Sequence, residues 1–100
     1  MLLVSCYQPI PDGEYRLVTV NGEKEYRKHF LTFKGQEFGS FTIQEGLKID
    51  HGKKIIQYES DNIFKFKRKD IVYRWKYILS NDTLRVESQN SNMNITLLKN

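Results

Sequence analysis

The chain has 100 residues, enough for one folded domain with one core and too few for two. Its composition is 39% hydrophobic and 13% aromatic, which excludes a disordered chain, because disordered chains are poor in aromatic residues. Sixteen Lys and Arg against twelve Asp and Glu leave a net charge of +4, which favours anionic surfaces without requiring a nucleic-acid partner. One cysteine cannot form an internal disulfide, so core packing and sheet hydrogen bonds must hold the fold.

The N-terminal segment contains that cysteine. Leu3, Val4, Ser5 and Cys6 resemble the lipobox of bacterial lipoproteins, in which a peptidase cuts before the cysteine and its thiol then carries a lipid. The resemblance implies lipidation of Cys6 and a lipid-anchored, periplasm-facing or surface-exposed position in the bacterial cell envelope. A complete leader has an apolar stretch of ~7 to 15 residues, so we expect most of it to lie upstream. The alternative is a free cysteine behind a short apolar strand or a leftover tag.

Residues 1–12 are interpreted as a lipobox remnant and tether, and residues 13–100 as the folded domain. Pro9 and Pro11 suit a tether because proline opposes strand formation. No apolar run approaches the ~18 to 20 residues of a transmembrane helix, since charged residues interrupt every stretch after Arg16.

Alternation with a period of two predicts β-strands along the domain. The clearest strand covers residues 71–79, where Tyr73, Trp75 and Tyr77 share a face and Arg74 and Lys76 lie opposite. Other strands are expected around residues 15–20, 29–33, 41–43, 47–49, 56–58, 64–66, 84–88 and 93–98. No window shows helical spacing behind a cap, so a long helix is not expected.

Turn dipeptides separate these strands, and Asn21-Gly22 is the strongest because a two-residue hairpin turn needs positive φ at both positions. The others are Lys34-Gly35, His51-Gly52, Asp61-Asn62, Lys69-Asp70 and Asn81-Asp82. Phe38 is out of phase with Phe41, which predicts a bulge or corner at Gly39.

Eight to nine short strands with short connections predict an antiparallel meander that closes into a small up-and-down barrel, with a two-sheet β-sandwich as the alternative. A barrel of this size is filled by side chains or admits one small ligand. The expected interior residues are Tyr15, Leu17, Phe33, Phe41, Tyr58, Phe66, Tyr73, Trp75 and Tyr77.

The pattern of the domain resembles the small bacterial lipocalin-like domains. The resemblance is carried by Gly13-Glu14-Tyr15, by Tyr73 to Leu79, by Asn81-Asp82-Thr83-Leu84 and by Ile95-Thr96-Leu97. It implies a calycin-type barrel that binds a small hydrophobic molecule or serves an envelope role.

A basic cluster is interleaved with aromatic residues near the C-terminal half. It consists of Lys65, Lys67, Arg68, Lys69, Arg74 and Lys76. Single-stranded nucleic acid is bound by such a combination only when charges and aromatic rings share a surface. Alternation places Phe64 and Phe66 on the face opposite Lys65 and Lys67, so the aromatic rings are expected to fill the core and the basic side chains to form a solvated surface. No nucleic-acid partner is therefore expected. With a lipid anchor, this surface could rest on anionic head groups.

No residue set predicts catalysis, a metal site or a cofactor. His29 and His51 are the only histidines, and only Asp50 stands beside one of them, whereas a metal needs three or four converging ligands. No nucleophile turn or phosphate loop is present. Two functions remain: an envelope lipoprotein whose barrel binds a small apolar ligand, and a filled barrel that acts as an inhibitor, immunity or assembly partner of another envelope protein. An enzyme is a distant third.

Overall fold

The protein is described from a computed structural model, which covers residues 9–59 and 62–100. All its regular elements are β-strands, and none of the described residues forms a helix that could cross a membrane. The strands are β1 (Gly13–Val20), β2 (Glu23–Lys24), β3 (Lys28–Lys34), β4 (Glu37–Gln44), β5 (Leu47–Ile55), β6 (Gln57–Glu59), β7 (Ile63–Arg68), β8 (Ile71–Ser80), β9 (Thr83–Ser88) and β10 (Asn94–Lys99). The all-β prediction is confirmed.

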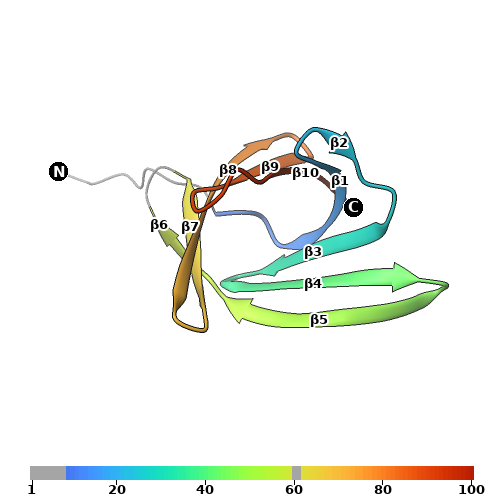
Figure 1. Cartoon of the computed structure of the whole chain (residues 1–100), viewed down its shortest axis with the longest axis horizontal. Helices are drawn as coiled ribbons and strands as arrows, with labels where there is room; N and C mark the ends of the chain where they lie inside the picture. The colour runs from blue at the N-terminus through green and yellow to red at the C-terminus, as the bar shows by residue number, and fades with distance from the viewer. Residues whose placement is uncertain (1–8, 60–61) are drawn as a thin grey trace.

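The strands form one antiparallel sheet in the order β5-β4-β3-β1-β10-β9-β8-β7-β6, with β2 beside β1. The sheet curls into a half-barrel, in which β3, β4 and β5 lie across from β8 and β9 (Figure 1). The first and last long strands pair, since Leu17 lies opposite Leu97. The break in the sheet therefore lies in the middle of the chain, between the edge strands β5 and β6, and not between the two ends of the chain.

Residues with positive φ make the hairpin turns. The turn predicted at Asn21-Gly22 is present, and the φ angles of the two residues are 52° and 81°. The prediction of a turn at His51-Gly52 is wrong. Gly52, with φ of 93°, lies inside β5 and forms a bulge, and its N–H donates to Asp50 Oδ1 at 2.7 Å. The turn before β5 is instead made by Glu45 and Gly46.

Side chains on the concave face of the sheet form the core. The core residues are Ile10, Tyr15, Leu17, Phe33, Ile56, Phe64, Tyr77, Leu84, Val86 and Leu97. Ile10, which the sequence assigns to the tether, is only 2% exposed, and the Tyr15 hydroxyl donates to the Pro11 carbonyl at 2.7 Å. Residues 10 and 11 therefore pack as part of the domain, while Cys6 lies outside the described residues.

Aromatic rings join the two sides of the half-barrel where backbone pairing is missing. Phe33 of β3 meets Phe64 of β7 with ring centroids 6.1 Å apart, and Phe38 of β4 meets Phe66 of β7 at 5.7 Å. Such pairs contribute ~0.5 to 1.5 kcal/mol each beyond their burial. They hold β3 and β4 against β7 although no ladder connects them.

Ile56 is the corner at which the chain leaves one end of the sheet and begins the other. Its side chain is fully buried, and its N–H donates to the Gln36 carbonyl at 2.8 Å. Ile55, its neighbour, is 66% exposed. Two consecutive isoleucines thus have different environments, since Ile56 is in the core and Ile55 is on the surface.

We expect Ile56→Ala to lower the free energy of unfolding by about 2 to 4 kcal/mol, because it leaves a cavity at the corner. The matched control Ile55→Ala should change it by less than about 0.5 kcal/mol. Urea denaturation followed by Trp75 emission measures both values. Equal effects of the two substitutions would show that the corner is not part of the core.

Candidate ligand pocket

An apolar pocket lies on the concave face, next to the filled core. Its volume is about 140 Å³, and its lining comes from six strands. The lining residues are Leu31, Phe38, Phe64, Phe66, Trp75, Val86 and Ile95. Five of them are only half-buried, which leaves the wall of the pocket partly accessible from outside.

The pocket wall offers nothing that would hold water. All its side chains are aliphatic or aromatic, and the one polar side-chain atom among them, Trp75 Nε1, is buried without a hydrogen-bond partner. A water molecule needs two to four polar partners, and an apolar cavity of ~150 Å³ stays dry and takes a benzene-sized molecule. The pocket is therefore suited to a small apolar group.

The expected interior residues lie on the concave face, with one exception. Tyr15, Leu17, Phe33 and Tyr77 fill the core, while Tyr58, Phe66 and Trp75 pack against it. Tyr73 stacks on Phe66 with ring centroids 5.4 Å apart. Only Phe66 and Trp75 of this set line the pocket.

Four pocket residues were not predicted as interior, namely Leu31, Phe38, Val86 and Ile95, whereas Phe64 was expected to fill the core together with Phe66. Alternation carries a signal for Leu31 and Phe64, whereas it places Phe38 on the face opposite the predicted interior residue Phe41. Leu31 is two residues from Phe33, and Phe64 is two residues from Phe66, so each shares the face of a predicted interior residue.

The exception is Phe41, whose predicted interior position is wrong. Strand β4 pairs with β3 without a register shift, so Phe38 lies opposite Phe33 and Phe41 lies opposite Phe30. Phe41 is therefore on the convex face, where its ring stacks on Phe30 at 4.9 Å and Lys48 Nζ lies 4.4 Å from the ring centroid. The bulge expected in β4 is in β5 instead, at His51 and Gly52, and does not rotate Phe41 inward.

The basic cluster is divided between two faces. Lys65 lies opposite Arg74, and both contact Glu59, at 3.1 and 3.4 Å. The hydrogen bond from Lys65 is the main cause that lowers the pKa of the Glu59 carboxyl. Lys67 and Lys76 lie on the same convex face as Lys65 and Arg74. Phe64 and Phe66 point to the other, concave face, as alternation predicted.

Arg68 is the member of the cluster that differs. It lies opposite Ile71, two positions beyond Phe66, and thus occupies the concave face at the end of β7. Lys69 follows it in the turn, with φ of 56°. The sequence pattern predicted one basic surface for the whole cluster, but the strand register places Arg68 on the other face of the sheet.

His29 and His51 extend the concave face beyond Leu31. Their ring centroids are 6.0 Å apart, and His51 Nε2 lies 3.1 Å from Thr42 Oγ1. Partial burial lowers the pKa of His29, and the neighbouring His51 and Arg27 lower it further. The described residues include no group of three or more His, Cys, Asp or Glu that could hold a metal ion.

We expect the protein to lose stability as pH falls through the ordinary histidine pKa of about 6.5. Because folding lowers the pKa of His29, the unfolded chain binds a proton first, and the free energy of unfolding decreases with falling pH. Thermal melts between about pH 7.5 and 5.5 should show a smaller decrease for His29→Gln than for the unmodified protein. His51→Gln should have the smaller effect of the two, since it removes only a secondary cause. An unchanged slope in His29→Gln would contradict this assignment.

Comparison with known proteins adds no further assignment. No protein-family model, curated protein sequence or solved structure matches this chain. The pocket geometry and the sequence are therefore the basis for its function.

Proposed function

We propose that the half-barrel binds a small apolar ligand in the pocket formed by β3, β4 and β7–β10, and that it has a binding and not a catalytic role. The observation that carries this proposal is a pocket of about 140 Å³ lined only by apolar side chains. A pocket of this volume accommodates an aromatic ring or the end of a short acyl chain, since pockets that bind drug-sized ligands are larger, at ~300 to 1,000 Å³. The half-buried Phe66 and Trp75 give such a group a route from the surface.

We expect the affinity of linear alcohols to rise about fourfold with each added methylene, since each buried methylene contributes ~0.8 kcal/mol. The increase should stop once the pocket is full. Titration of butanol to octanol, followed by the emission of Trp75 in the pocket wall, measures the series.

Leu31→Phe should weaken the binding of all these alcohols by filling the pocket. Ile78→Phe is the control, because Ile78 is 52% exposed and lies opposite Arg85, away from the pocket. Emission that no alcohol shifts, or an equal loss in both variants, would contradict ligand binding in this pocket.

We propose in addition that a lipid on Cys6 anchors the domain in the bacterial cell envelope. The supporting observations are the lipobox-like sequence and the short span to Ile10, which is in the core. Four residue steps reach at most about 14 Å, so the anchor would hold the filled end of the barrel close to the membrane. Ile10 lies at that end, where its N–H donates to the Tyr58 hydroxyl at 3.2 Å.

This anchor is tested by expressing the gene with its upstream region in bacteria that are fed a palmitate analogue. We expect the protein to be labelled and found with the membranes. Cys6→Ala should remove both the label and the membrane association. Equal labelling of the variant would contradict lipidation at Cys6.

A second candidate function is pairing with another envelope protein through β5. Among the described strands, β5 pairs only with β4, and all its residues except Lys54 are exposed. Free strand edges pair with other chains, although Lys53, Lys54 and the bulge at Gly52 protect this one. The alcohol titration separates the two candidates, because pairing at β5 needs no occupied pocket.

A further inference from the structure

The concave side of the gap between β5 and the β6–β7 edge borders the apolar pocket. Phe38 of β4 and Phe66 of β7 both line the pocket, and their ring centroids lie 5.7 Å apart across the gap. A groove of about 380 Å³ at the same gap opens on the convex side, because all its lining residues except Phe66 are at convex-face positions. A ligand whose apolar end fills the pocket therefore has its other end beside the concave-face residues that flank Phe38 and Phe66.

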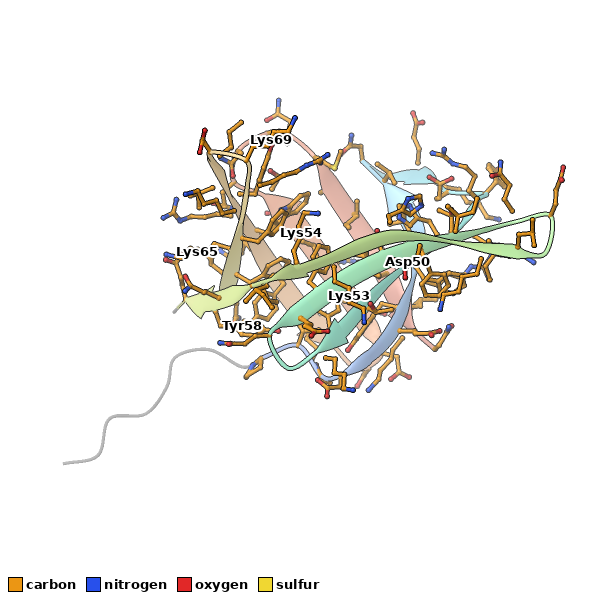
Figure 2. All side chains as sticks on the ribbon, turned by 90° about the horizontal axis from the view of Figure 1, so that it is seen from below. Asp50, Lys53, Lys54, Tyr58, Lys65 and Lys69 are labelled. Atoms are coloured by element: carbon orange, nitrogen blue, oxygen red, sulfur yellow. The ribbon has the colours of Figure 1, made fainter. Side chains whose placement is uncertain are left out.

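Cationic side chains lie on both strands that border the gap. Lys54 of β5 is opposite Phe38, a pocket residue, and so faces the concave side. Figure 2 shows Lys53 and Lys54 on opposite sides of β5, with Lys54 on the side of the β7–β8 hairpin that carries Lys69. On the other border, Arg68 occupies the concave face of β7 beyond Phe66.

The described strands bring no acidic side chain to the concave face beside these cations, and the nearest acid in sequence, Asp70, lies in the β7–β8 turn. Every Asp or Glu in the nine described strands of the sheet path lies at a convex-face position: Glu14 opposite Thr32, Glu37 opposite Lys34, Asp50 opposite Phe41, Glu59 opposite Ile63 and Glu87 opposite Lys76. Among the described residues, neither Lys54 nor Arg68 forms an ion pair. In contrast, Lys65 and Arg74 at the groove are paired with Glu59.

We infer that the ligand is an amphipathic anion, whose short apolar group fills the pocket and whose carboxylate or phosphate lies between Lys54 and Arg68. This inference rests on the proposed function and names the class of ligand. Each contact is partly solvated, so the charges add selectivity for an anion over a neutral molecule while burial of the apolar group supplies most of the affinity. The arrangement disfavours a cationic amphiphile, which would meet like charges at both borders.

The test compares three probes with the same eight-carbon chain: octanoate, octanol and octylamine. Calorimetric titration at neutral pH and low salt should give octanoate an affinity about fivefold or more above that of octanol, from two partly exposed charge contacts. Octylamine should bind more weakly than octanol. Raising the salt concentration should reduce the difference between octanoate and octanol.

The variant Lys54→Gln with Arg68→Gln should bind octanoate no tighter than octanol, and its unchanged affinity for octanol shows that the fold is intact. Lys53→Gln with Lys76→Gln is the matched control, since it removes the same charge from the convex face. Equal affinities of octanoate and octanol for the unmodified protein, or an equal loss of octanoate binding in both variants, would overturn the inference alone. Absence of binding by all three probes would overturn the proposed function and this inference with it.

Discussion

Contact between aromatic rings across the concave face is the interaction on which the rest of the structure depends. The described sheet breaks between its edge strands β5 and β6, and no strand ladder joins these two edges. Phe33, Phe38, Phe64 and Phe66 bridge the break, and the buried corner at Ile56 fixes the point where the chain crosses it. Burial of apolar rings does not require the fixed geometry of a strand ladder, so ring contacts can stabilise the two sides of an open sheet.

The same packing divides the interior into two parts. Near the corner and Ile10, side chains fill the space completely, as the near-zero exposure of Tyr15, Leu84 and Leu97 shows. Farther along, β3 and β4 extend away from β7 and β8 (Figure 1), and an unfilled apolar volume lies between their facing side chains. The pocket thus lies where the two sides of the open sheet are joined by side chains and not by strand pairing.

The fold class was readable from the sequence, because a period of two in hydrophobicity directly reflects the alternating faces of a strand. Strand β8 shows this best, since its aromatic face is the concave face. Phe41 and His51-Gly52 were misjudged for one reason. A glycine near a phase change marks an irregularity without telling which of two neighbouring strands carries it, and here β5 carries the bulge while β4 stays regular.

The pocket was only partly predictable. Alternation predicts the face on which Trp75 and Phe66 lie. It does not predict whether an inward residue fills the core or lines the pocket, because that depends on the spacing of the strands across the whole sheet. The inward position of Arg68 was hidden within a run of basic residues, where only the count from Phe66 distinguishes it.

Pairing of β1 with β10 also governs how the domain is assembled. The two strands lie at opposite ends of the chain, and the backbone N–H of Asn100 still donates to the Glu14 carbonyl at 2.8 Å. Contacts of such long sequence separation form only after a large loop has closed, which slows folding. During synthesis, β1 must therefore wait until β10 has left the ribosome, and until then the edge of β1 that β10 covers is exposed to other chains.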